Sequence, residues 1–360
     1  IYIMNIDHCN THSSFKDKVY MSNLCQEITL PTRPVQHIDD PEGEIALCIL
    51  SAINLGLIKE KDELEDLCDL SVRALDEIID YQEYPVEAAK KSTEARRSLG
   101  IGYIGLAHFL AKNKVKYNDK EALVLVDEIT EAFQYYLLKA SNNLAKEKGK
   151  CDYFHKTKYA DGILPIDTYK KDLDSIIKRK LSYDWNTLRE DIKSSGLRHS
   201  TLSAQMPSES SSVVSNATNG VEPPRDYLSV KKSKKGTLKQ IVPDYNRLKN
   251  FYTLLWDMPS NEGYINVISV MQKYFDQAIS GNWSYNPENY KDNEVPTSVM
   301  ANDLLTTYKL GWKTSYYQNT YDAKSDVDEP THTLGWHDNV KEEPKEIILD
   351  DQEECEACAI

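Results

Sequence analysis

The sequence contains no long apolar run. No stretch of about 20 consecutive apolar residues occurs, so nothing in it is typical of a transmembrane helix. The N-terminus lacks the charged, apolar and small-residue succession of a secretory signal. Only seven of the 360 residues are cysteines, and their spacing matches no disulfide framework. These absences predict a cytoplasmic protein with reduced thiols and no contact with a membrane.

Acidic residues outnumber basic ones. The chain has 43 basic and 57 acidic residues, a net charge of −14. Residues 321–360 hold 13 of the acidic and 3 of the basic residues and carry −10 of that charge. The remainder is nearly neutral and has no broad basic field, so we expect no nucleic-acid partner. The single basic run, residues 231–236, ends in glycine and predicts a solvated hairpin turn.

Apolar residues make up 40% of the chain, enough for a sizeable core. Apolar residues that recur at three- and four-residue steps predict helices in several parts of the chain. The expected helical regions are 59–82, 88–112 (interrupted by glycines), 119–148, 167–195, near 260–280 and near 298–310. Short strands between long helices favour an α/β body over residues 1–320. We expect the acidic residues 321–360 to form a flexible tail.

The segment Ser22-Asn23-Leu24-Cys25-Gln26-Glu27 is the first candidate for chemistry. In an extended chain, alternate side chains share a face, so Asn23, Cys25 and Glu27 would lie together. A thiol between an amide and a proton acceptor is a plausible reactive centre. A half-buried strand with an inert cysteine fits the same letters.

A second candidate is Met206-Pro207-Ser208-Glu209-Ser210-Ser211-Ser212. Proline before a run of hydroxyls predicts the start of a helix, which we expect to end at Asn219-Gly220. The free N–H groups at such a start, together with serine hydroxyls, suit an anion such as phosphate. A merely well-capped helix remains the alternative.

Three cysteine or tyrosine features are ambiguous by themselves. Cys48 lies in an apolar segment typical of a buried cysteine. The adjacent Tyr316 and Tyr317 are typical of core and surface packing. Cys355 and Cys358 form a C-x-x-C pair, which fits half a zinc site or an exchanging dithiol.

Two further patterns are rejected as sites. Residues 100–105 fit G-x-G-x-x-G, but Glu94–Arg97 before them look helical, where a dinucleotide fingerprint needs a strand. The His8, Cys9 and His12 cluster lacks a fourth ligand, so we expect no metal site.

In their order along the chain, these motifs resemble the large catalytic subunit of the class Ia ribonucleotide reductases. The resemblance implies that Cys25 becomes a thiyl radical that removes the 3′ hydrogen of the substrate ribose. Glu27 would be the general base on the ribose hydroxyls, and Asn23 would orient Glu27 and the substrate. Cys48 would be redox-active, with a partner cysteine upstream of this chain.

The same resemblance assigns the other motifs. Tyr316 and Tyr317 would relay the radical from the small subunit, which carries a tyrosyl radical and di-iron centre. Cys355 and Cys358 would be re-reduced by thioredoxin or glutaredoxin, although their spacing is narrower than in bacterial members. The diphosphate of the ribonucleoside diphosphate substrate would lie at a set of residues around the second motif: Ser208, Glu209, Ser210, Ser211 and Arg225.

The fold implied is the second half of a ten-stranded α/β barrel, with a central finger loop at about residues 15–30. The first half, with the ATP and dNTP effector sites, would precede Ile1. We therefore expect a C-terminal portion that is inactive without the N-terminal half and the small subunit. Two alternatives remain: an inactive remnant that binds the small subunit, and a thiol-disulfide oxidoreductase using the tail cysteines.

Overall fold

The computed structural model describes residues 2–38, 40, 42–233 and 236–321. Its centre is a row of parallel chain segments. Strand β2 (Ile49–Asn54) pairs in parallel with β3 (Leu99–Ile104). Residues 201–205 continue the row through the parallel Ile101–Ser203 bridge, and residues 277–281 follow through the parallel Gln205–Ile279 bridge.

The far end of this row is formed by the last described residues. Strand β6 (Trp283–Tyr285) pairs in parallel with β8 (Gln318–Thr320). Next to it, β7 (Thr314–Ser315) pairs antiparallel with β1 (Ile3–Met4) at the other end of the chain. The row is open, and the described residues form no closed sheet.

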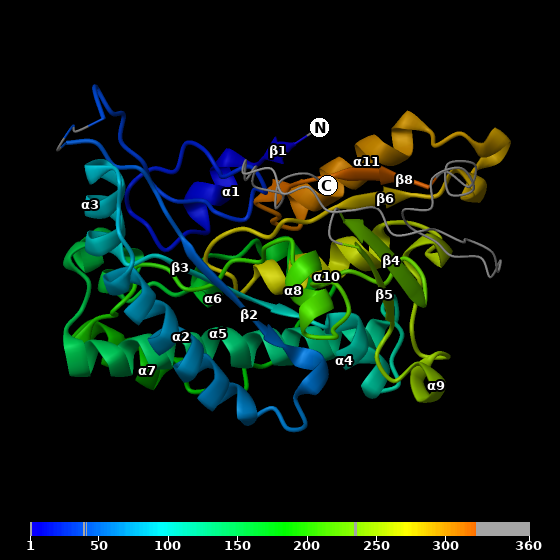
Figure 1. Cartoon of the computed structure of the whole chain (residues 1–360), viewed down its shortest axis with the longest axis horizontal. Helices are drawn as coiled ribbons and strands as arrows, with labels where there is room; N and C mark the ends of the chain where they lie inside the picture. Colours follow the sequence, from blue (N-terminus) through cyan, green and yellow to red (C-terminus); the bar gives the residue numbers. More distant parts are fainter. Residues whose placement is uncertain (1, 39, 41, 234–235, 322–360) are drawn as a thin grey trace.

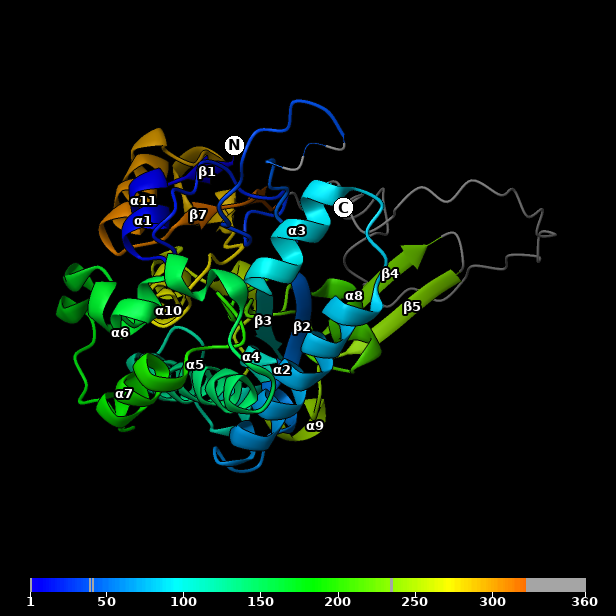
Figure 2. The same cartoon turned by 90° about the vertical axis from the view of Figure 1, so that its left-hand side faces the viewer.

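Helices cover the row. The long helix α5 (Lys120–Lys148) packs against α2 (Glu63–Tyr81) and α10 (Glu262–Gln272), and Figures 1 and 2 show α5 lying beneath the strands. The other helices are α1 (Ile6–Thr11), α3 (Glu87–Arg96), α4 (Leu106–Lys112), α6 (Pro165–Thr168), α7 (Trp185–Ser195), α8 (Glu209–Val214), α9 (Tyr245–Leu248) and α11 (Thr297–Lys309).

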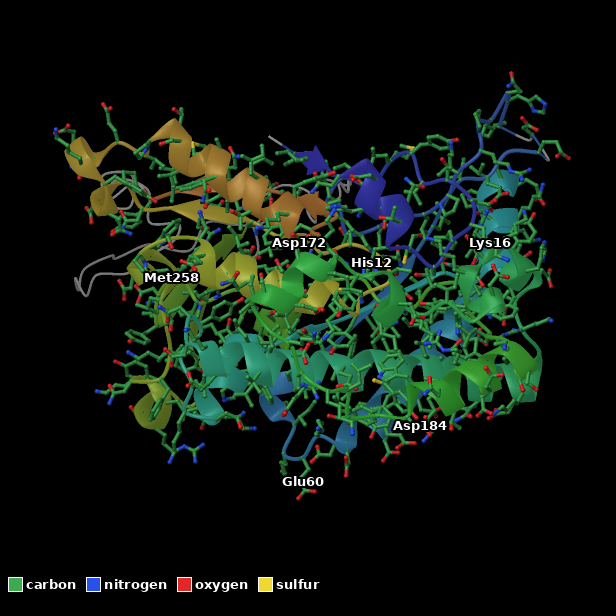
Figure 3. The ribbon with its side chains drawn as sticks, turned by 180° about the vertical axis from the view of Figure 1, so that it is seen from behind. His12, Lys16, Glu60, Asp172, Asp184 and Met258 are labelled. Carbon is green, nitrogen blue, oxygen red and sulfur yellow. The ribbon has the colours of Figure 1, made fainter. Side chains whose placement is uncertain are left out.

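Short 3-10 helices occupy many of the connections between these elements. Their bounds are Leu55–Leu57, Asp152–Lys156, Lys158–Asp161, Lys171–Ser175, Leu255–Asp257, Pro287–Asn289 and Lys291–Asn293. Side chains fill the space between α5 and the layer that contains α1 and α11, and His12 lies in this space (Figure 3). His12 is buried and bonds through its ring nitrogens to the Thr168 hydroxyl and the Gln272 carbonyl. Both ring nitrogens of this buried histidine are therefore paired.

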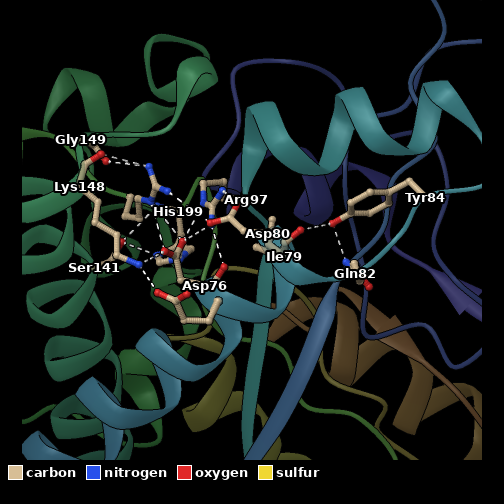
Figure 4. A network of polar contacts seen from close by, with 12 residues as sticks. Asp76, Ile79, Asp80, Gln82, Tyr84, Arg97, Ser141, Lys148, Gly149 and His199 are labelled. Carbon is tan, nitrogen blue, oxygen red and sulfur yellow. Dashed lines mark hydrogen bonds and ion pairs between the residues drawn. The ribbon is translucent and has the colours of Figure 1, made fainter.

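A buried ionic network lies at the amino ends of β3 and the 201–205 segment (Figure 4). The Asp76 carboxylate, from α2, is fully buried and lies 2.6 Å from Arg97, 3.2 Å from Arg198 and 3.1 Å from His199. Burial would raise the pKa of Asp76, but hydrogen bonds and charges from His199 and Arg97 outweigh it and hold the pKa well below its usual range. The network joins α2 to the chain that enters two adjacent strand segments.

The predicted helices at 59–82 and 119–148 are confirmed as α2 and α5, and those near 260–280 and 298–310 as α10 and α11. The predicted hairpin is present as β4 (Leu228–Ser233) and β5 (Gly236–Ile241). None of the helices in the described ranges is both long and apolar enough to cross a membrane.

Two expected helical regions are confirmed only in part. Residues 167–195 are helical at α6 and α7 but not between the 3-10 helix Lys171–Ser175 and α7. The ends of 88–112 are the helices α3 and α4, but the glycine-rich stretch between them is the fully buried strand β3. A Cβ at Gly102 would lie 2.7 Å from the Ala204 carbonyl oxygen, and one at Gly100 would lie 2.5 Å from Leu50. The glycines therefore allow neighbouring segments to approach closely, and a helix precedes the strand, as the rejection of a dinucleotide fingerprint required.

Candidate active site

Residues 23–27 form a tight turn rather than an extended strand, which corrects the expectation above. Gln26 has φ +66° and its N–H donates to the Asn23 carbonyl at 3.2 Å. The Asn23 side-chain oxygen accepts from the Ile28 N–H at 3.0 Å and closes the turn. Asn23, Cys25 and Glu27 still lie together, because the turn folds them back on one another instead of aligning them on one face.

The Glu27 carboxylate is buried, with 2% of its surface exposed. Its side chain forms hydrogen bonds with Asn23 and, at 3.1 Å, with the Ser280 hydroxyl. The same hydroxyl also bonds to the Cys25 carbonyl. Burial raises the pKa of Glu27, although the hydrogen bonds act in the opposite direction. A carboxylate tuned in this way suits a general base that works nearer to neutral pH.

Cys25 lies at the end of a line of phenols. The Tyr316 hydroxyl is 3.5 Å from the Cys25 Sγ and 3.2 Å from the Tyr317 hydroxyl. The two rings have centroids 4.0 Å apart. Burial and these neighbours raise the pKa of Tyr316 far above its ordinary value, so the phenol keeps its proton. A protonated phenol touching both a thiol and a second phenol can pass an electron and a proton together.

A third tyrosine joins this cluster, and the sequence analysis did not single it out. The Tyr2 ring centroid lies 5.1 Å from that of Tyr316 and 5.7 Å from that of Tyr317. The hydrogen bond with Tyr317 raises the pKa of Tyr2. The signal in the sequence is weak, because Tyr2 reaches the pair only through the antiparallel pairing of β1 with β7, at opposite ends of the described chain.

Cys48 lies just before β2, beside the loop that carries Cys25. Its Sγ accepts a hydrogen bond from the Gln277 amide at 3.6 Å, and Gln277 also accepts from the Thr29 N–H at 3.3 Å. Burial raises the pKa of Cys48 to about 12. Each of the cysteines in the part of the chain described is a free thiol.

The serine-rich segment follows the carboxyl end of residues 201–205. Ser208 is buried and its hydroxyl donates to the Met206 carbonyl at 2.9 Å, while Ser210 and Ser211 are exposed in the first turn of α8. Helix α8 ends at Val214, which is shorter than expected, because Asn216 takes a left-handed conformation (φ +48°). The chain then turns back so that Gly220 donates to the Ser212 hydroxyl.

Residues 277–281 are hydrogen-bonded both to the Cys25 turn and to the chain just before the serine-rich segment. Ala278 donates to the Glu27 carbonyl and accepts from the Gln205 N–H, just before the serine-rich segment. Glu209 and Arg225 line a cavity of about 140 Å³ between α8, the turn after it and the β4–β5 hairpin. The structure thus places the five substrate-site candidates around one helix start and turn.

Two predicted features fall elsewhere. Cys355 and Cys358 lie outside the described residues. His8 and Cys9 bond to the carbonyls of Trp312 and Lys313, so these side chains hold α1 to the chain before β7. In the described ranges no three His, Cys, Asp or Glu side chains gather as metal ligands.

Comparison with known proteins identifies the family of the chain. The family described as ribonucleotide reductase, barrel domain, matches residues 1–318. The chain therefore belongs to the ribonucleotide reductase family. An α/β barrel is consistent with the parallel row of segments flanked by helices.

Individual relatives that the chain resembles are alpha subunits of ribonucleoside-diphosphate reductases. The ribonucleoside-diphosphate reductase subunit alpha of Haemophilus influenzae is 61% identical over 332 residues, which cover 91% of this chain and 44% of that protein. The subunit alpha of reductase 1 from Escherichia coli is 57% identical over 91% of this chain and 43% of its own length. The subunit alpha of phage T4 is 43% identical over 91% and 44%. The chain thus spans less than half the length of these relatives.

Proposed function

We propose that this chain supplies the C-terminal part of the catalytic subunit of a ribonucleoside-diphosphate reductase, which makes 2′-deoxyribonucleoside diphosphates by thiyl-radical chemistry. The observation that carries the proposal is the contact of Cys25 with the Tyr316–Tyr317 pair, next to the buried Glu27. Family membership and the named relatives support it. In this proposal the parallel row is the second half of a ten-stranded barrel, and the turn around Cys25 is the tip of its finger loop.

The chemistry assigned to the residues is a reduction at C2′ of the ribose. The Cys25 thiyl radical takes the hydrogen atom from C3′, and Glu27, oriented by Asn23, accepts the proton of the 3′ hydroxyl. The 2′ hydroxyl takes a proton from one thiol of the redox cysteine pair and leaves as water. Two electrons come from Cys48 and a partner cysteine in the N-terminal part, which become a disulfide. Cys25 then returns a hydrogen atom to C3′.

The radical itself would come from outside the chain. A small subunit with a tyrosyl radical and a di-iron centre supplies the oxidising equivalent when bound. Tyr317, only half-buried, would receive it, and Tyr316 would pass it to Cys25. The contacts of 3.2 and 3.5 Å along this line fit such a transfer. Thioredoxin or glutaredoxin would restore the dithiol through Cys355 and Cys358.

The substrate diphosphate would occupy the start of α8. The backbone N–H groups at Ser210 and Ser211 and their exposed hydroxyls offer donors, and Ser208, Glu209 and Arg225 flank them. Anions bind well at helix starts because the first backbone N–H groups point outward there and the helix dipole is positive. Effector nucleotides would bind to the N-terminal part rather than to this chain.

The test is reconstitution of CDP reduction from this chain, the complementary N-terminal part and the small subunit. Formation of deoxyCDP that requires all three components supports the proposal. Binding of CDP and of the small subunit without any product would favour the competing view, an inactive remnant that only binds. Disulfide exchange by this chain alone would favour the thiol-disulfide oxidoreductase.

A further inference from the structure

Between the serine-rich segment and the tyrosine pair lies an amide that contacts both sides. Asn282 follows residues 277–281, and its side-chain oxygen accepts from the Tyr317 N–H at 2.9 Å. Its side-chain nitrogen donates to the Glu222 carboxylate at 2.5 Å. Its backbone N–H donates to the Tyr264 hydroxyl. Both ends of the amide are therefore paired, and its orientation is fixed.

The bond to Tyr317 interrupts a backbone ladder. On either side of it, Tyr316 donates to the Gly281 carbonyl and Trp283 donates to the Tyr317 carbonyl. Between these two backbone bonds, the Tyr317 N–H bonds to a side chain instead. The position of the Tyr317 backbone thus depends on where the Asn282 side chain lies, and that depends on Glu222.

Glu222 also lies beside the proposed diphosphate site. It lies in the turn after α8, where its N–H donates to the Asn219 carbonyl. It lines the cavity of about 140 Å³ that also contains Glu209 and Arg225, and a separate small cavity that contains Asn282 and Tyr264. Its side chain therefore stands between the two, with one face toward each.

The charges around Glu222 make it responsive to an anion. Arg225 attracts its carboxylate and Glu209 repels it, while burial raises its pKa. A diphosphate bound beside α8 competes with Glu222 for the positive charge of Arg225 and adds negative charge of its own. Both effects change how strongly Glu222 holds the Asn282 amide.

We propose that Glu222 and Asn282 are positioning residues that link the diphosphate-binding segment to the backbone of Tyr317. The inference rests on the function proposed above and goes beyond it, because it makes the alignment of the tyrosine pair depend on an occupied substrate site. Through this link, Tyr317 is aligned for radical transfer only when the substrate diphosphate is bound.

The test replaces Asn282 and Glu222 in the complete catalytic subunit and measures the reduction of CDP in the presence of the small subunit. In Asn282→Asp the acceptor for Tyr317 remains, but a second carboxylate faces Glu222. We expect kcat to fall about tenfold, the effect of one lost hydrogen bond to a charged group, while the dissociation constant for CDP stays within twofold. Adding Glu222→Gln restores an amide–carboxylate pair with the donor on the other side, and we expect most of kcat to return.

Asn286→Asp is the matched control, because it removes an amide donor to the Trp256 carbonyl in the same region without touching Tyr317. It should turn over like the parent. If Asn282→Asp fails to fold, Glu222→Leu removes the same hydrogen bond and carries the same expectation for kcat alone. Parent-like kcat in Asn282→Asp, or a double variant no better than the single one, overturns the inference alone. A parent subunit that binds CDP without reducing it contradicts the proposed function and the inference with it.

Discussion

At the scale of single residues, the site is held together by side chains that pair across long stretches of sequence. Ser280 bonds to Glu27, 253 residues away, and also to the Cys25 carbonyl. It fixes the carboxylate relative to the thiol. Replacing Glu27 or Cys25 by a side chain of the same shape therefore tests the chemistry of the residue more than its effect on folding.

Replacing Glu27 by Gln keeps the shape and removes the base. We expect kcat for CDP to fall at least a hundredfold, which is within the usual range for loss of a general base. Because burial raises the pKa of Glu27, the activity of the unsubstituted enzyme should fall on the acid side at a pH above that at which an exposed glutamate ionises, about 4.3. The kcat of the Glu27→Gln variant measures the first effect, and a pH profile of kcat for the unsubstituted enzyme measures the second. An acid limb at the pH of an exposed glutamate would count against the role.

Replacing Tyr316 by Phe keeps the packed ring and removes the hydroxyl between Cys25 and Tyr317. We expect CDP reduction to fall below detection while the melting temperature stays within a few degrees, because the ring still packs and only a shared hydrogen bond is lost. Tyr81→Phe is the control, since that tyrosine is 90% exposed at the end of α2. Substantial activity in the Tyr316 variant would exclude the phenol from the radical path.

At the scale of elements, the amino ends of the strands depend on the Asp76 network. Asp76 lies on α2, and its partners Arg97, Arg198 and His199 lie on chain that enters β3 and the 201–205 segment. A carboxylate with a lowered pKa in the folded state stabilises it above the pH at which the unfolded group ionises, about 3.9. That contribution is lost as the pH falls through the lower pKa of the folded state.

Asp76→Asn should therefore lower the free energy of unfolding by about 3 kcal/mol at neutral pH, because the buried Arg97 then keeps only the half-exposed Asp80 as a counter-charge. Urea denaturation of the complete protein measures this. The control is Asp69→Asn on the same helix, whose ion pair with Arg73 is partly exposed, with each side chain more than a third accessible, and contributes less than about 1 kcal/mol. Equal losses in the two variants would contradict a special role for the buried pair.

The sequence predicted the long helices well, because their apolar spacing is local. It did not predict β3, because a strand rich in glycine shows no alternation of apolar and polar side chains. Glycine is needed there because Leu50 and Ala204 on neighbouring segments leave no room for a Cβ. The same reason explains the missed site residues. Ser280, Gln277 and Tyr2 reach Cys25, Cys48 and the tyrosine pair only after distant segments align.

Residues with a distinctive chemical pattern were easier to predict. The resemblance of the Cys25 turn, the serine-rich segment and the tyrosine pair to one family was enough to expect them in one site. The turn itself was not foreseen, because the left-handed conformation of Gln26 is set by bonds of Asn23 to Ile28 and to Gln26, not by a glycine at that position. The roles of all these residues remain predictions.

At the scale of the whole molecule, the open row of strands is the main feature. Strand β2 pairs on one side only among the described residues, and Leu47, Leu50 and Leu57 near it are exposed. Apolar side chains along a free strand edge are typical of a surface that another chain covers. This agrees with a chain that spans less than half the length of its relatives.

Cys25 is the residue proposed to react with the substrate, and its replacement by serine tests that role. The complete subunit carrying Cys25→Ser, assembled with the small subunit, is given CDP, and deoxyCDP is quantified. We predict that no deoxyCDP forms, although CDP binds and the protein melts at the parent temperature. Formation of deoxyCDP by this variant would contradict the account, because a serine hydroxyl cannot supply the thiyl radical.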